Sequence, residues 1–169
     1  VSKAVSQFID MPNIQEFYKS LQPKKAEHFR KHLRMYVEIC MPDCPFEVSS
    51  TNRYTKSMHE ATVAARRLIR KGEVIKYLRG TRVRLTFKEK AKLGDHFSIV
   101  EQTRNKAASL FLGPARFLNH DCAANAELMP IGRTGMEVRA SCDILIGEEI
   151  LVSYGDHYFD EGNHNCLCR

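Results

Sequence analysis

Residues 119–122 place four side chains of different chemistry next to one another. The segment 117–122 reads Phe-Leu-Asn-His-Asp-Cys, so an amide, an imidazole, a carboxylate and a thiol follow an apolar pair. Such density is typical of a functional site. An ordinary turn is the alternative, because Asn and Asp hydrogen-bond their own backbone and favour turns.

A second segment, at residues 147–156, makes the functional interpretation stronger. It reads Gly-Glu-Glu-Ile-Leu-Val-Ser-Tyr-Gly-Asp, and a Cys-x-Cys pair follows at 166–168. In this order, the motifs resemble the closing part of SET-domain protein lysine methyltransferases. The segments 113–122, 154–159 and 52–54 look like the histone H4 lysine-20 methyltransferases of the Suv4-20 type, especially fungal members. The resemblance covers roughly residues 46–168.

The resemblance implies methyl transfer from S-adenosylmethionine to lysine 20 of histone H4 in nucleosomes. It assigns Tyr154 the place of the SET tyrosine, whose hydroxyl orients the methyl group and the amine. The alternative is a buried sheet tyrosine with a hydrogen-bonded hydroxyl. Lysine normally titrates near pH 10.4. A narrow apolar channel beside a sulfonium would favour the neutral, nucleophilic amine by desolvation and like-charge repulsion.

The resemblance also implies which residues hold the cofactor. Asn119 would do so through its side chain and His120 largely through its backbone. The further cofactor contacts that it implies are Tyr54, Ala61, Thr62, Val63, Ala64 and Arg104. Many SET proteins carry a Gly-x-Gly near residues 61–64, and this chain does not.

A substrate pocket and a zinc site follow from the same resemblance. Ser98 matches a pocket position that influences how many methyl groups are accepted, and Phe117 and Phe159 would wall the channel, with plain core aromatics as the alternative. Three ligands of a zinc site would be the thiolates of Cys122, Cys166 and Cys168. The fourth ligand would lie beyond Cys168, or be His164 or a solvent molecule. Cys142 is interpreted as a buried thiol.

Charge favours a negatively charged partner. Lys and Arg outnumber Asp and Glu by 26 to 20, which gives a net charge of +6, and basic residues crowd together over 66–92. On neighbouring strands they could form a continuous positive face for the phosphates of nucleosomal DNA. The alternative is a solvated, soluble surface.

The compartment is inferred from what the sequence lacks. No apolar run approaches the roughly 20 residues that span a bilayer, no signal peptide opens the chain, and the six cysteines are too sparse for a secreted disulfide scaffold. We therefore expect no membrane partner and a reducing compartment, and the resemblance implies nuclear chromatin. The chain begins without Met, so an excised fragment is expected. Nothing in the sequence indicates an oligomeric state.

The elements that must position these residues follow from periodicity. Residues 10–40 have a helical pattern, with Asp10 as a cap ahead of Pro12 and an apolar stripe that excludes Glu38. Short strands separated by turns, one of them at Gly80, follow at 46–48, 62–65, 74–78, 83–87, 97–100, 126–129, 136–140 and 149–152.

The strand pattern predicts the fold class and the domain limits. Because no βαβ alternation occurs, we predict an α+β protein with several small, mostly antiparallel sheets. The resemblance adds a SET-type fold with a pseudoknot-like threading near the C-terminus. We expect a helical unit over 1–45, a SET domain over 46–160 and the start of a truncated zinc-binding post-SET segment over 161–169.

Two rival functions belong to other classes. A SET-like module could bind chromatin without turnover, and a small zinc-stabilised domain could bind DNA and ignore S-adenosylmethionine. Methyl transfer to nucleosomes excludes the first, and calorimetry with S-adenosylmethionine tests the second.

Overall fold

The computed structural model of the chain describes residues 1–53, 60–94, 98–101 and 107–168. The chain forms two compact units, Val1–Cys44 and Pro45–Arg169. Of the residues predicted to contact the cofactor, Tyr54 and Arg104 lie outside the described residues.

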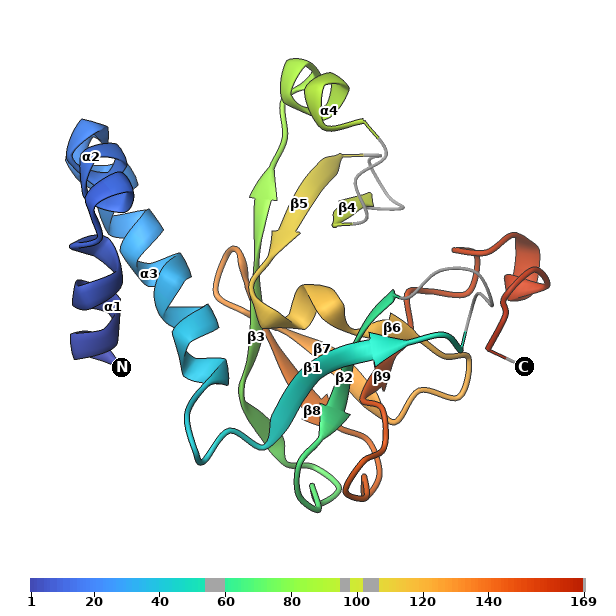
Figure 1. The fold of residues 1–169 in the computed structure, drawn as a ribbon. Coiled ribbons are helices and arrows are strands. Elements are labelled where there is room, and N and C mark those ends of the chain that lie inside the picture. The colour runs from blue at the N-terminus through green and yellow to red at the C-terminus, as the bar shows by residue number, and fades with distance from the viewer. Residues whose placement is uncertain (54–59, 95–97, 102–106, 169) are drawn as a thin grey trace. The chain divides into compact units, whose positions relative to one another are not determined.

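The first unit consists of three helices, α1 Ser2–Ile9, α2 Pro12–Ser20 and α3 Pro23–Ile39 (Figure 1). Both prolines occupy the first helical position, where the missing N–H costs least. The predicted cap at Asp10 is wrong. Met11 caps α2 and Asp10 ends α1, because the chain is already helical before Asp10.

The helical stripe also differs from the prediction at Glu38. Its residue exposure is 3%, although a glutamate was expected on the polar face of α3. The carboxylate is satisfied locally, since Arg34 Nε lies 2.9 Å from Glu38 Oε1 one helical turn away. A paired charge can therefore be buried at a position where the periodic pattern alone predicts exposure.

The second unit contains two sheets in its described part. Strands β1 Phe46–Thr51 and β2 Glu60–Ala65 pair antiparallel. A seven-stranded sheet has the order β4-β5-β3-β8-β7-β9-β6. Its strands are β3 Val74–Arg84, β4 Ile99–Glu101, β5 Ala108–Leu112, β6 Asn119–His120, β7 Ala126–Ile131, β8 Gly135–Ala140 and β9 Leu151–Val152. The predicted α+β class with mostly antiparallel pairing is confirmed.

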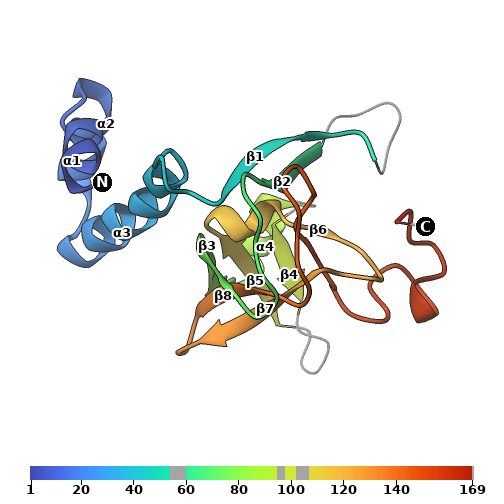
Figure 2. The same ribbon diagram turned by 90° about the horizontal axis from the view of Figure 1, so that it is seen from below.

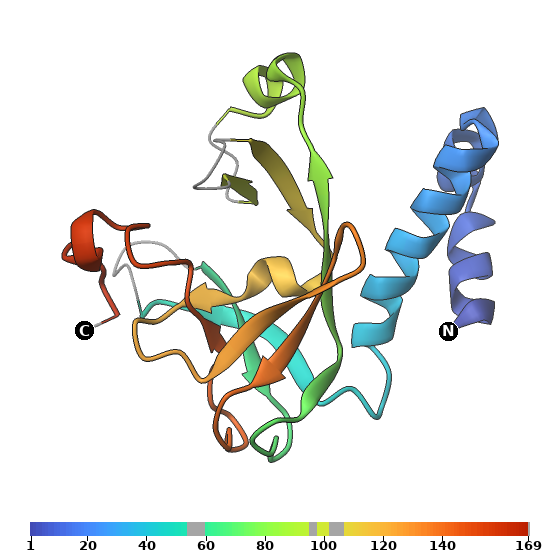
Figure 3. The same ribbon diagram turned by 180° about the vertical axis from the view of Figure 1, so that it is seen from behind.

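Strand β9 is inserted between β6 and β7, which are consecutive in the chain, and it pairs parallel with both. A late segment is thus threaded between two earlier ones. Figures 2 and 3 show the C-terminal segment, in red, beyond this end of the sheet and across from β3. The threading brings residues near 120 against residues near 152.

Gly80 lies inside β3, so the turn predicted there is wrong. A Cβ at Gly80 would come within 2.4 Å of the Phe111 ring on β5. Glycine is needed here because an aromatic ring packs against the backbone, not because the chain turns. The core contains large, fully buried side chains from both sheets, among them Phe46, Ile75, Leu78, Val138 and Val152.

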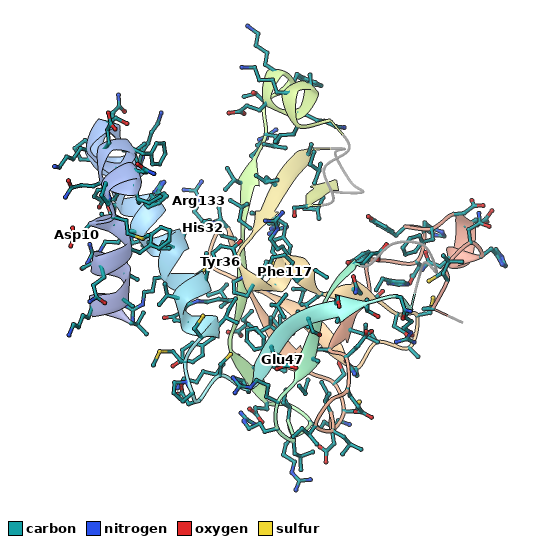
Figure 4. The ribbon with its side chains drawn as sticks, viewed as in Figure 1. Asp10, His32, Tyr36, Glu47, Phe117 and Arg133 are labelled. Carbon is teal, nitrogen blue, oxygen red and sulfur yellow. The ribbon has the colours of Figure 1, made fainter. Side chains whose placement is uncertain are left out.

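The strand predicted at 83–87 ends at Arg84, and helix α4 Phe87–Leu93 follows it. Thr86 and Glu89 form a capping box, which explains the change from strand to helix. Short 3₁₀ helices occur at η1 Pro114–Phe117 and η2 Glu161–Asn163. Figure 4 shows Phe117 on η1 and Glu47 on β1. None of the described helices has the length and hydropathy that crossing a bilayer requires.

Candidate functional site

The two motif segments meet at the parallel pair of β6 and β9, which we call the β6–β9 junction. Asn119 pairs with Leu151 and His120 with Val152. The Asp121 N–H continues the ladder and donates to the Val152 carbonyl oxygen at 3.2 Å. The junction places Tyr154, two residues after β9, beside the β6 segment.

Tyr154 is fixed by two hydrogen bonds to the β6 segment. Its backbone N–H donates to His120 Nδ1 at 3.0 Å, and its hydroxyl donates to the Leu118 carbonyl oxygen. The two rings lie 5.4 Å apart between centroids. Because Nδ1 accepts this hydrogen bond, the neutral imidazole carries its hydrogen on Nε2.

His120 is held in the neutral form. Its residue exposure is 3%, and burial lowers the pKa of His120 because the imidazolium would lose its hydration. The charge of Asp121 and a backbone bond at Val152 raise the pKa of His120 by less than burial lowers it. His120 therefore acts as a positioning residue that accepts from the Tyr154 backbone, and no proton transfer by His120 is needed.

An aromatic cluster surrounds Tyr154. The centroid of its ring lies 4.8 Å from that of Tyr158, and Tyr158 lies 4.7 Å from Phe159. The Phe159 ring also lies 5.3 Å from the His120 ring. These edge-to-face and tilted contacts restrain the rings and favour one orientation for Tyr154.

A pocket of about 190 Å³ opens beside Tyr154. Most of its walls are apolar, and Tyr154, Tyr158 and Ser98 add hydroxyl groups. Phe117 and Phe159, which the sequence suggested as channel walls, are not among the residues that line it. The lining consists of Ser98, Ile99, Val100, Phe111, Ala115, Arg116, Leu118, Leu128, Val152, Ser153, Tyr154 and Tyr158.

Ser98 is buried in the pocket wall and held by Arg116. Its exposure is 3%, and Arg116 Nε donates to Ser98 Oγ at 2.7 Å. The Arg116 guanidinium also lies 5.3 Å from the centre of the Phe117 ring. Phe117 thus supports the side chain that holds Ser98, and it lies one contact away from the pocket.

Strand β2 lies against the chain that enters β9. Ala64 forms a bridge with Glu149, and the Ile150 N–H donates to the Val63 carbonyl oxygen at 2.8 Å. Val63 has no exposed surface, so its side chain belongs to the core.

Two polar side chains, Thr62 on β2 and Asn119 on β6, have atoms that a ligand could bond. Asn119 Nδ2 donates to the Ala61 carbonyl oxygen at 3.0 Å. The Thr62 hydroxyl is buried and has no hydrogen-bond partner in the described part of the chain. A buried hydroxyl normally has a partner, so Thr62 indicates a place where a bound polar group would complete the bonding. This fits a cofactor held between β2 and β6.

Sulfur and nitrogen atoms that could bind a metal lie together near His120 Nε2, the ring nitrogen that does not bond Tyr154. The side chains of His120, Cys122, Cys166 and Cys168 bring one ligand atom each within 4.8 Å of one another. Cys166 Sγ lies 3.1 Å from Cys168 Sγ, and Cys122 Sγ lies 3.4 Å from His120 Nε2. Tetrahedral zinc with Zn–S bonds of about 2.3 Å separates its ligands by about 3.8 Å, so this soft donor set fits zinc.

The pKa values of the Cys122 and Cys168 thiols are shifted in opposite directions. Hydrogen bonding to Cys168, together with burial, raises the pKa of Cys122 to about 11. Although burial alone would raise it, the pKa of Cys168 is lowered, because the Cys122 N–H and the Cys166 thiol donate to its sulfur. The sulfur of Cys168 is therefore the one best suited to carry negative charge.

The sequence interpretation missed His120 as a member of this group, and His164, which it considered, does not belong to it among the described residues. Strand β6 ends at His120 and Cys122 lies in the turn that follows, so the turn brings the two side chains together. Cys142, predicted as a buried thiol, is exposed. It follows β8 directly, in the loop where the alternating burial of the strand ends.

Arg53 was also missed, although it lies in a motif segment. Its guanidinium lies 2.7 Å from the Asp121 carboxylate and 3.6 Å from Glu149, and it reaches the Cys168 carbonyl oxygen at 3.5 Å. Asp121 is only 8% exposed. Arg53 therefore neutralises the junction and ties it to the cysteine tail.

Residues 60–155 match the family described as "SET domain". The chain belongs to the SET-domain family. Its curated relatives include proteins named "Histone-lysine N-methyltransferase SET9" from three fungi. The protein from Gibberella zeae is 50% identical over 100% of this chain, that from Chaetomium globosum is 51% identical over 92%, and that from Phaeosphaeria nodorum is 50% identical over 99%. The chain spans only about a quarter of their length, with shares of 26%, 22% and 26%.

Proposed function

We propose that this SET domain is a histone-lysine N-methyltransferase that uses S-adenosylmethionine and acts on lysine 20 of histone H4 in nucleosomes. The observation that supports this best is the β6–β9 junction, where Tyr154, His120 and Asn119 meet beside an apolar pocket. The names of the relatives support the class of substrate.

The pocket would take the lysine side chain and favour its neutral amine. Leu118, Leu128 and Val152 line it, and an apolar lining disfavours a charged ammonium because the charge would lose its hydration. The Tyr154 hydroxyl, directed by its bond to the Leu118 carbonyl oxygen, would orient the amine nitrogen. Catalysis would then come from positioning and desolvation.

The cofactor would lie between β2 and β6. When bound, S-adenosylmethionine supplies the methyl group, which its sulfonium sulfur releases to the attacking amine. The Asn119 Oδ1 atom would accept from the ammonium of the cofactor, the backbone at His120 would contact its adenine, and the Thr62 hydroxyl would gain its missing partner. Residues 61–64 complete this wall, and we assign Tyr54 and Arg104 to it from the family motif.

Ser98 would influence how many methyl groups the lysine receives. Its hydroxyl lies in the pocket wall, where its volume and polarity affect the space for a methylated amine. Phe117 would act through Arg116, and Phe159 would support the Tyr154 ring through the aromatic cluster.

Zinc would be held by Cys122, Cys166 and Cys168. The fourth ligand would be a residue beyond Cys168 or a solvent molecule, because His120 accepts from the Tyr154 N–H at Nδ1 and so carries its hydrogen on Nε2. When bound, zinc cross-links the C-terminal segment to β6, because its binding energy is available only to the folded arrangement. We therefore assign residues 161–169 to a zinc-binding segment that follows a SET domain over 46–160, with residues 1–45 as a separate helical unit.

Nucleosomal DNA would contact the basic stretch 66–92 at its α4 end. Arg84, Lys88, Lys90 and Lys92 gather there around the helix, and Glu89 is engaged in the capping box. Cations around an exposed helix favour phosphate binding. We propose a nuclear location on chromatin for this reason.

Mass spectrometry of reconstituted nucleosomes tests the proposed function. After incubation with the domain and S-adenosylmethionine, we expect methylation at lysine 20 of histone H4 and none when that lysine is replaced by arginine. Methylation of another lysine would overturn the specificity, and cofactor binding without any transfer would favour a chromatin-binding module.

A further inference from the structure

Two loops at the end of β3 opposite α4 are bound to each other (Figures 1 and 3). We call them the paired-loop tip, which comprises residues 66–73 and 141–148. Ile69 and Ile144 exchange both backbone hydrogen bonds at 2.9 Å, and the Lys71 N–H donates to Asp143 Oδ1 at 2.8 Å. The Gly147 N–H donates to the Ala65 carbonyl oxygen at 2.7 Å. The tip is therefore a rigid feature.

The tip exposes two adjacent aliphatic side chains. Ile144 has no exposed surface, whereas Leu145 and Ile146, which follow it, are 57% and 72% exposed. The Glu148 carboxylate accepts from the Leu145 N–H at 2.7 Å and fixes the backbone of this turn. Of these three apolar side chains only that of Ile144 is buried, so the fold does not require apolar residues at the next two positions.

Some of the charged side chains around the aliphatic pair form ion pairs and others do not. Arg67 pairs with Glu73, and Arg70 pairs with Asp143 at 2.9 Å. Arg66 and Lys71 are exposed, and neither has an ion pair in the described part of the chain. Four basic residues of the tip stand against three acidic ones, Glu73, Asp143 and Glu148. The tip thus offers an apolar centre with a rim of small net positive charge.

We propose that the paired-loop tip docks on the histone surface of the nucleosome, in an apolar depression bordered by carboxylates. This inference rests on the proposed function, because the partner is the substrate particle. Aliphatic side chains gain binding energy when a protein surface buries them, whereas phosphates give them none. The positive rim complements carboxylates, and the rigid backbone reduces the entropy lost on binding.

Paired rate measurements on two substrates test the proposal. In the double variant Leu145→Ser/Ile146→Ser, we expect nucleosome methylation to fall about 10-fold in kcat/KM, mainly through KM, because serine cannot replace the free energy gained when two aliphatic side chains are buried. Methylation of a free H4 tail peptide should stay unchanged. Ile131→Ser, at a residue on β7 that is 48% exposed, is the matched control and should change neither rate.

Each outcome of these rate measurements either supports or overturns the docking of the tip. An equal loss on both substrates would mean that the tip supports the active site, and an unchanged nucleosome rate would mean that it contacts nothing there. Either result overturns the docking proposal. If the unaltered domain methylates neither substrate, the proposed function fails instead.

Site-specific crosslinking identifies the partner without relying on turnover. A photo-crosslinking residue in place of Ile146 should form adducts with histone protein in reconstituted nucleosomes. Arg66→Glu/Lys71→Glu in the same chain should reduce their yield. Adducts with DNA would show a nucleic-acid surface, and no adducts would show a free surface, and both results contradict the proposal.

Discussion

At the β6–β9 junction and at the paired-loop tip, segments far apart in the sequence pair with each other, yet the polar groups there are used differently. Beside the junction, on β2, the Thr62 hydroxyl is buried without a partner in the described part of the chain, and four side chains that could hold a metal ion lie close together. At the tip, the Asp143 carboxylate accepts from both the Lys71 N–H and the Arg70 guanidinium.

This difference separates a ligand site from a rigid surface. Buried groups with unused bonding capacity cost stability unless a ligand completes them, so they indicate where a ligand belongs. Groups that satisfy one another need no ligand and make a loop rigid. The four predictions below test this contrast.

The largest effect is expected for Tyr154→Phe. Loss of the hydroxyl that donates to the Leu118 carbonyl oxygen should lower kcat about 100-fold, as is typical when one oriented polar group is removed from an active site. Cofactor affinity measured by calorimetry should stay nearly the same. Tyr158→Phe is the control from the same cluster, and an equal effect there would contradict the role of Tyr154.

Arg53→Met should destabilise the second unit by about 2 kcal/mol, because it leaves the Asp121 carboxylate buried without its cation. Arg67→Met removes an ion pair of the tip that is more exposed than the Arg53–Asp121 pair, with side chains 48% and 28% exposed against 40% and 11%. It should cost less than about 1 kcal/mol. Urea denaturation measures both. Equal costs would mean that the junction and the tip do not differ in this way.

Thr62→Val should separate stability from ligand binding. Removing a buried hydroxyl that lacks a partner should leave the ligand-free domain equally stable or stabilise it by up to about 1 kcal/mol. Affinity for S-adenosylmethionine should fall about 5-fold, equivalent to one modest hydrogen bond. A clear loss of stability with unchanged affinity would assign Thr62 to the core.

Acid should loosen the tip slightly. The pKa of Asp143 is lowered by the Lys71 N–H and Arg70, and the pKa of Glu73 is lowered by Arg67. Carboxylates with a lowered folded pKa contribute stability above their unfolded pKa, near 4, and lose it as the pH falls through the folded value. The protection factor of the Lys71 amide, corrected for the pH dependence of intrinsic exchange, should therefore fall below about pH 4, and a protection factor that stays constant there would contradict this role.

Sequence patterns predicted which segments meet better than they predicted the elements that carry them. The segments at 117–122 and 147–156 were expected to meet, and β6 and β9 pair in register. Periodicity failed at Glu38, where an ion pair permits burial, and at Gly80, where a ring from another strand requires glycine. Both causes are tertiary contacts, which no local pattern contains.

Local chemistry explains two other differences. The capping box of Thr86 and Glu89 was present in the sequence and predicts the helix that replaced the expected strand end. His120 lies beside the three cysteines because the chain turns after β6, and periodicity does not contain that turn. Arg53 joins the site only because β1 ends beside the junction, which depends on the threaded topology.

Hydrogen exchange with and without S-adenosylmethionine tests most directly whether unused bonding capacity marks the ligand site. We predict added protection at residues 61–64 and 119–122 and no change at 66–73 and 141–148. Binding confirmed by calorimetry with no added protection at 61–64 and 119–122, or with protection centred on the tip, would contradict this account.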